Sequence, residues 1–176
     1  IQSGEMMPIY PNNAFLFIFS GFDYFGKRIH TEENTTKNLK TAAEEITILA
    51  TQNSNVKETL QMLYKIMPFR ASKYLYKRII DNSKIAGRIS SDKNGTPIPQ
   101  YSAIINSINR KYSSLTTENI RNASMFYKHI LTDVSIVLDG SQIVISEELK
   151  IRFVLLGLIY SMRNDFAHGS AMASTK

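Results

Sequence analysis

Residues 147–168 read EELKIRFVLLGLIYSMRNDFAH, and this stretch decides the fold that we predict for the chain. Ser146 can cap a helix that begins here, and Glu147 and Glu148 fall in its first turn, where acidic side chains suit the helix dipole. The middle is apolar almost all round, so the helix must be surrounded, either by its own bundle or by a partner subunit. Gly169 suits the position just after its end. We therefore predict one long helix over about 147–168.

The rest of the chain is predicted to be mostly helical because apolar residues recur at helical spacing along it. The expected helices cover 14–30 (where many Phe residues also allow a strand), 37–53, 55–67, 70–90 (one helix or a broken pair), 100–111 and 116–133. Residues 87–100 are rich in Gly, Pro, Ser and Asn and predict a loop. β-branched residues flank Asp139-Gly140, which predicts a short β-hairpin or an extended loop near 134–146. The expected fold class is mainly α, a helical bundle with one short hairpin.

Length and composition narrow the class of protein. The 176 residues suit a single domain, residues 1–176, and the 43% hydrophobic and 20% charged content is that of a soluble globular protein. Because the chain starts at Ile1 rather than Met, we expect it to be part of a longer chain. With no cysteine, disulfides, thiolate catalysis and cysteine-based zinc sites are excluded. The net charge of +6 favours polyanionic partners.

Two apolar runs, 14–26 and 151–160, are candidates for a membrane span. Both are shorter than the roughly 20 apolar residues that a spanning helix needs, and the first carries Asp23. We predict that both belong to the core, that the protein has no membrane partner and that its location is cytoplasmic.

The final helix ends in a cluster of polar residues, Arg163, Asn164, Asp165 and His168. Arg163 and His168 are about 140° apart around a helix, whereas Asn164 and His168, at i and i+4, share a stripe. A guanidinium can grip phosphate oxygens, and an imidazole moves a proton near neutral pH. The sequence has no metal-ligand cluster, so the fitting reaction is metal-independent RNA cleavage in which the substrate's own 2′-OH attacks. The alternative is a plain helix C-terminus, where cations suit the dipole.

The segment RNDFAH (163–168) resembles the Arg-(four to six residues)-His motif of HEPN domains, with Asn164 at the polar position that commonly follows the arginine. The resemblance covers about the last 25 residues. It implies a helical bundle that dimerises and brings two motifs into one RNase cleft, with Arg163, Asn164 and His168 as catalytic residues and no cofactor or metal. Many such proteins are RNA-cleaving effectors in toxin–antitoxin systems and antiviral defence, so an antitoxin or another defence-system protein is an expected partner. A subgroup that pairs with nucleotidyltransferases carries tyrosine two residues after the histidine, where this chain has Ser170.

Two functional classes stay open. The first is an RNA endonuclease that acts as a homodimer, with residues such as Phe153, Leu156 and Ile159 of the last helix at the dimer interface. The second is a non-catalytic HEPN-like module that binds RNA or protein, or only dimerises. A helical regulatory domain with an accidental motif is a third possibility.

A basic stripe could bind RNA. Arg70, Lys73 and Lys77 share one helical face, which Lys84 and Arg88 would extend if the helix continued, and Tyr74 and Tyr76 lie between them. Such a face can follow an RNA backbone while an aromatic ring stacks on a base, although a solvated face has the same pattern.

Three further patterns are interpreted as ordinary structure. Asp23, among aromatic residues, is expected at the rim of an amphipathic helix. Arg121 and His129 imitate the motif at the wrong spacing on a plain helix face. His30, in HTEE, lacks the spacing and the third partner of a metal site.

Overall fold

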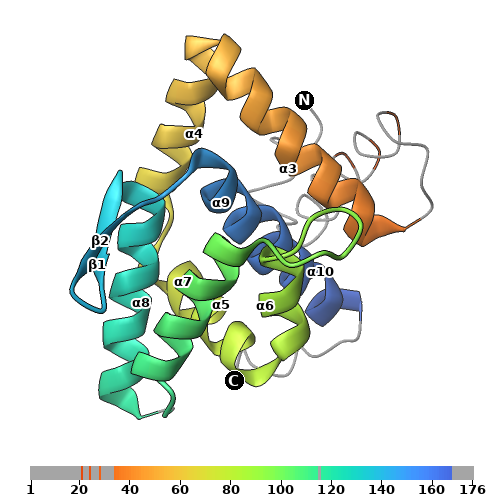
Figure 1. Ribbon diagram of the computed structural model, residues 1–176. Helices are drawn as coiled ribbons and strands as arrows, with labels where there is room; N and C mark the ends of the chain where they lie inside the picture. Colours follow the sequence, from red (N-terminus) through yellow and green to blue (C-terminus); the bar gives the residue numbers. More distant parts are fainter. Residues whose placement is uncertain (1–20, 22–23, 25–27, 29–33, 115, 168–176) are drawn as a thin grey trace, which may run out of the picture.

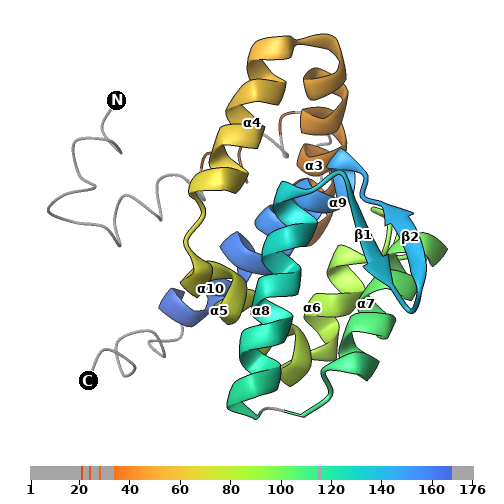
Figure 2. The same cartoon turned by 90° about the vertical axis from the view of Figure 1, so that its left-hand side faces the viewer.

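The computed structural model describes residues 34–114 and 116–167, together with Gly21, Tyr24 and Arg28. Along these residues the chain is mainly helical with one small antiparallel sheet, which confirms the predicted mainly α class and the short hairpin (Figures 1 and 2). The helices are α3 (Thr35–Gln52), α4 (Ser54–Ile66), α5 (Phe69–Asp81), α6 (Ser83–Ile89), α7 (Pro99–Lys111), α8 (Thr117–Thr132), α9 (Glu147–Arg152) and α10 (Tyr160–Ala167). A π-helix, η1 (Phe153–Ile159), joins the last two.

Short polar side chains mark where several of these helices begin. The Asn53 side chain accepts hydrogen bonds from the first turn of α4, and Thr116 and Ser146 do the same for α8 and α9. The segment predicted over 70–90 is the broken pair, because Asn82 ends α5 and its Oδ1 accepts from Lys84 N at 3.0 Å to begin α6. The predicted loop begins at Ser90 rather than at residue 87, since Gly87 and Arg88 belong to α6.

The predicted hairpin is confirmed as strands β1 (Ser135–Leu138) and β2 (Ser141–Val144). Leu138 pairs with Ser141, so two residues form the turn. These are Asp139 and Gly140, with φ values of 50° and 78°. Positive φ at both positions matches the right-handed twist of the strands, and Asp-Gly is one of the dipeptides that tolerate it.

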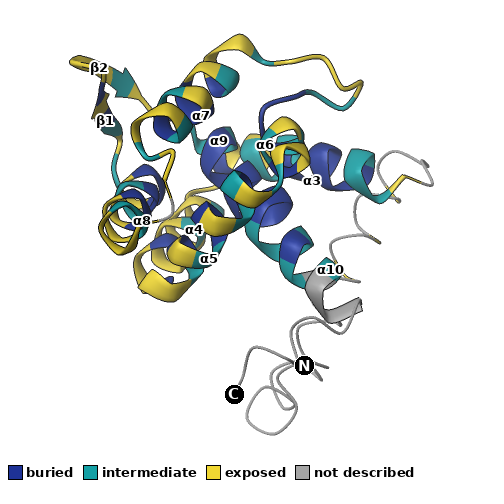
Figure 3. Ribbon diagram, turned by 90° about the horizontal axis from the view of Figure 1, so that it is seen from below, coloured by how far each residue is buried: buried dark blue, intermediate teal, exposed yellow. Residues whose placement is uncertain are grey.

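The last helical segment runs through the middle of the bundle, where α3, α5 and α6 pack against η1. The rings of Phe153 and Tyr127 pack in an edge-to-face arrangement, with 5.3 Å between their centroids. Phe153 and Leu156 are fully buried among the chain's own helices, so the prediction that they form a dimer interface is wrong. Buried residues gather on the inner sides of the helices in Figure 3, with exposed residues on the outer sides of α4, α7 and α8.

This segment is not the regular α-helix that was predicted. Residues 153–159 form a π-helix, whose i→i+5 hydrogen bonds each span one more residue than the bonds of an α-helix. Gly157 lies in this stretch, where a Cβ would come within 2.5 Å of Leu75 Cδ1 and 3.1 Å of Ile89 Cδ1. The apolar sequence predicted burial but not this change of helix type.

No helix in the described part of the chain is long and apolar enough to cross a membrane. The run 151–160 belongs to the core, as predicted, with Phe153, Leu155 and Leu156 all buried. Of the run 14–26 only Gly21 and Tyr24 are described; both are helical and exposed.

Candidate nucleic-acid interface

Two of the three predicted catalytic residues lie on α10. Arg163 and Asn164 are consecutive in this helix, as the sequence predicted, and Asn164 is half-buried. The Arg163 side chain, the Asp165 side chain and the whole of His168, Gly169 and Ser170 lie outside what the structure describes. The approach of Arg163 to His168 is therefore still a prediction.

Helix α6 reaches α10 through a contact that the sequence did not predict. The Arg88 guanidinium carbon lies 4.6 Å from the centroid of the Tyr160 ring, within the range of a cation–π interaction. Tyr160 and Asn164 are i and i+4 neighbours on α10 and share a stripe. A cation of α6 therefore lies about one helical turn from the predicted motif.

The basic stripe on α5 is confirmed as an exposed face. Arg70, Lys73 and Lys77 are all exposed and follow one another at i, i+3 and i+7. The stripe does not continue along one helix to Lys84 and Arg88, because α5 ends at Asp81 and α6 is a separate helix.

The tyrosines between the basic residues have different surroundings. Tyr76 is fully buried and its hydroxyl donates to the carbonyl of Tyr112, so it cannot stack on a base. Tyr74 is half-buried, and its ring centroid lies 5.9 Å from the Arg78 guanidinium carbon. The stripe can therefore offer charge, and of the two tyrosines only Tyr74 is partly accessible.

A buried cation that the sequence analysis missed holds the loop after α6. The side chain of Arg152 is 1% exposed, and its Nη1 donates to the carbonyls of Ile89 at 3.3 Å and Ser91 at 2.8 Å. Its Nε bonds Glu148 Oε1 at 2.6 Å, and its Nη2 lies 3.7 Å from Glu44 Oε1. Two carboxylates thus compensate the burial of one guanidinium.

Lys40 of α3 holds the same loop from the other side. Its Nζ donates to Ser91 Oγ and to the Asp92 carbonyl, both at 2.7 Å. Burial lowers the pKa of Lys40, and the neighbouring Arg152 guanidinium lowers it further, although Asp92 acts in the opposite direction.

The sequence contains one indication of the Arg152 ion pair. Glu148 and Arg152 are spaced i, i+4, which indicates an ion pair on a helix surface but not that the pair is buried.

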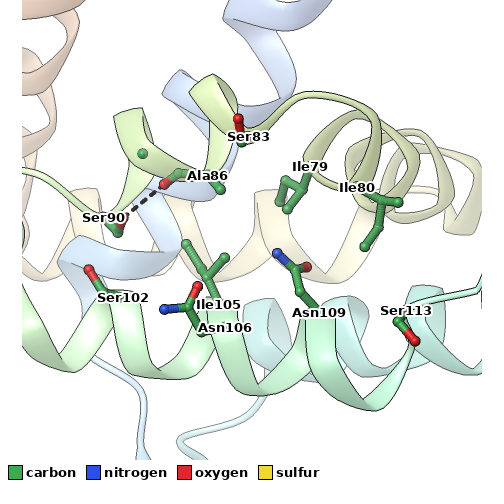
Figure 4. A pocket seen from close by; sticks show the side chains of 11 residues that line it. Ile79, Ile80, Ser83, Ala86, Ser90, Ser102, Ile105, Asn106, Asn109 and Ser113 are labelled. Carbon is green, nitrogen blue, oxygen red and sulfur yellow. Dashed lines mark hydrogen bonds between the residues drawn. The ribbon is translucent and has the colours of Figure 1, made fainter.

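The loop held in this way forms one wall of a groove. A pocket of about 510 Å³ lies between α5 and α6 on one side and α7 on the other (Figure 4). A second pocket of about 480 Å³ adjoins it, bounded by α6 and the loop, and the two share Gly87, Ser90 and Ser102. Lys84 and Arg88 line the second pocket.

Arg121 and His129 were interpreted as residues of an ordinary helix face, and both are exposed on α8. Arg121 is exposed, and His129 Nδ1 lies 3.0 Å from Asp133 Oδ2 near the end of α8, so these two residues form no joint site. Among the described residues no group of His, Asp and Glu could hold a metal ion. Asp23 and His30 lie outside the described part.

Comparisons with models of protein families, with curated proteins and with solved structures gave no match for this chain.

Proposed function

We propose that this protein is a metal-independent RNA endonuclease of the HEPN type. In this proposal His168 transfers a proton as general acid or base, Arg163 stabilises the charge on the scissile phosphate and Asn164 orients the imidazole. The 2′-OH of the RNA attacks the adjacent phosphorus, so the protein needs to supply only proton transfer and charge stabilisation.

The observation that carries the proposal is the position of the motif. RNDFAH begins on α10, which directly continues the most buried helical segment of a helical bundle. A buried segment fixes the direction in which α10 projects, and catalytic groups work best on such rigid supports. The Arg88–Tyr160 contact adds positive charge beside α10, and the cations of α5 form a further exposed basic face.

The proposal includes a homodimer, because Arg163 and His168 are about 140° apart around a helix and one copy places them poorly for a shared phosphate. Phe153 and Leu156 are excluded from the interface by their burial, which leaves Ile159 and Tyr160, both half-buried, as candidate contacts. We place the activity in prokaryotic defence or a toxin–antitoxin pair, where an antitoxin would be the protein partner.

The site is tested by comparing RNA cleavage in EDTA by the wild type and by His168→Ala and Arg163→Lys. Both variants should lose cleavage, the second because a point charge cannot replace the bidentate guanidinium. The chain supplies its own controls in the imitation motif, since His129→Ala and Arg121→Lys remove the same groups from α8 and should cleave normally. Full activity of His168→Ala would refute the catalytic assignment, whereas a wild type that binds RNA without cleaving it would favour the non-catalytic binding module.

A further inference from the structure

The groove between α6 and α7 has a chemistry that suits one class of ligand. The pocket shown in Figure 4 presents hydroxyls such as Ser83, Ser102 and Ser113, together with the amides of Asn106 and Asn109. Ile80 and Ala86, which are half-buried, supply apolar surface. None of the described residues that line the two adjoining pockets is acidic, whereas Lys84 and Arg88 bring two cations to one end.

One polar atom beside the groove lacks a hydrogen-bond partner among the described residues. Asn109 points from α7 toward α5 in Figure 4, and its Oδ1 is buried without a hydrogen-bond partner among the described residues. A buried acceptor of this kind favours a ligand that donates a hydrogen bond. A side-chain amide can pair with the edge of a nucleobase, while an adjacent apolar side chain packs on the base face.

The groove is also rigid on the side of the loop. Ile98 N bonds the Ser90 carbonyl at 2.7 Å, and Asp92 Oδ1 accepts from the backbone of Asn94 and Thr96 at 2.9 and 2.8 Å. Lys40 and Arg152 hold the same loop from beneath. A wall that is already ordered costs little conformational entropy when a ligand binds.

The cationic end of the groove leads toward the predicted motif. Lys84 and Arg88 have no ion-pair partner among the residues that the structure describes, and Arg88 lies against Tyr160 of α10. A phosphate held by these two cations would therefore lie close to the helix that carries Arg163 and Asn164.

We propose that this groove binds a segment of single-stranded RNA, with a base packed on Ile80 beside the Asn106 and Asn109 amides and the backbone phosphates at Lys84 and Arg88. The segment then continues over Arg88 toward α10, so that the groove selects the stretch of RNA presented for cleavage. This substrate assignment rests on the proposed ribonuclease function, but it is tested by binding alone.

Binding is measured by the fluorescence anisotropy of a labelled short oligouridylate with His168→Ala protein, so that cleavage does not interfere. Gly87 lines both pockets, and a Cβ added there meets nothing within 4 Å, so Gly87→Phe fills the groove without disturbing the core. It should weaken binding by about tenfold or more, while Gly87→Ala, the matched control, should bind like the parent. Lys84→Gln and Arg88→Gln should each weaken binding and lower its salt dependence, whereas Lys57→Gln on α4 should not.

The location is checked independently by crosslinking the same protein to an oligonucleotide that carries 4-thiouridine. Crosslinks should fall on residues 83–113. Equal affinity of Gly87→Phe and Gly87→Ala, crosslinks confined to α4 or the hairpin, or no binding of the oligouridylate would each overturn the proposal. If Gly87→Phe loses binding and the wild type does not cleave RNA, the groove remains the RNA-binding site and the ribonuclease proposal is refuted.

Discussion

Gly157 of η1 lies so close to Leu75 of α5 that a Cβ on the glycine would be only 2.5 Å from Leu75 Cδ1. Leu75 and Ile89, the two neighbours of Gly157, are themselves buried in the core and have little room to move. The absence of a side chain at Gly157 therefore lets the central segment, α5 and α6 meet.

We expect Gly157→Ala to destabilise the protein. Replacing a helical glycine by alanine gains about 1 kcal/mol of helix propensity, but overpacking of a core costs about 1–3 kcal/mol. The net loss in the free energy of unfolding should be about 1 kcal/mol, measured by urea denaturation. Gly87→Ala is the matched control, because its Cβ has open space, and it should stabilise the protein by up to about 1 kcal/mol. An equal gain in the free energy of unfolding for Gly157→Ala and Gly87→Ala would contradict the close packing at η1.

A second prediction concerns the buried guanidinium of Arg152. Arg152→Met removes the donors to the Ile89 and Ser91 carbonyls and leaves Glu148 without its partner, so stability should fall by about 3 kcal/mol. Replacing Glu148 by Gln in the same protein should restore part of the loss, since the uncompensated charge is then gone. Arg110→Met, which breaks an exposed pair with Asp139, should cost less than about 1 kcal/mol. A similar small loss for Arg152→Met would show that the loop is not held by this residue.

The third prediction concerns alkaline pH. Burial raises the pKa of Tyr127 above its ordinary value of 10.0, and the neighbouring Tyr76 raises it further. Below pH 10.0 the tyrosine is protonated in both states, but above it the unfolded chain releases a proton that the folded chain keeps, so stability falls as pH rises. The hydroxyl has no hydrogen-bond partner among the described residues, so Tyr127→Phe should change stability little near neutral pH. Above pH 10.0, the free energy of unfolding of Tyr127→Phe, measured by urea titration, should fall less steeply with pH than that of the wild type. An equally steep fall in both proteins would mean that Tyr127 ionises in the folded protein.

Much of the fold could be predicted because it depends on local signals. Helical spacing of apolar residues located α3 and α4, and Asp139-Gly140 located the hairpin through its demand for positive φ. Apolar spacing could not predict the π-helix, nor the close packing of Gly157 against Leu75 and Ile89, which are far apart from it in the sequence. The burial of Arg152 was missed for the same reason, since its carbonyl partners lie more than 60 residues away.

The candidate site, too, could be predicted only in part from local signals. Helical spacing was enough to place Arg163 and Asn164 on one helix and the α5 cations on one exposed face. The contact of Arg88 with Tyr160 and the groove along α6 and α7 depend on how separate helices pack, which periodicity does not specify.

A fourth prediction tests the exposed face of α5. Replacing Lys73 and Lys77 with Ala should weaken RNA binding evenly across sequences, because phosphate contacts carry no base information. Each lost contact should reduce the slope of log affinity against log salt by about 0.7 for a single strand. The same double replacement at Lys57 and Lys65, which are exposed on α4, serves as the control. An unchanged salt dependence would assign Lys73 and Lys77 to an ordinary solvated face.

The central claim is that the RNA's own 2′-OH is the nucleophile and that no metal ion takes part. It is tested most directly by identifying the ends left when the purified protein cleaves RNA in EDTA, beside the same RNA with a single 2′-deoxy substitution at the cleavage site. The account predicts 2′,3′-cyclic phosphate or 3′-phosphate ends, and no cleavage at the substituted position. Products with 3′-hydroxyl ends, or cleavage that requires a divalent cation, would contradict it.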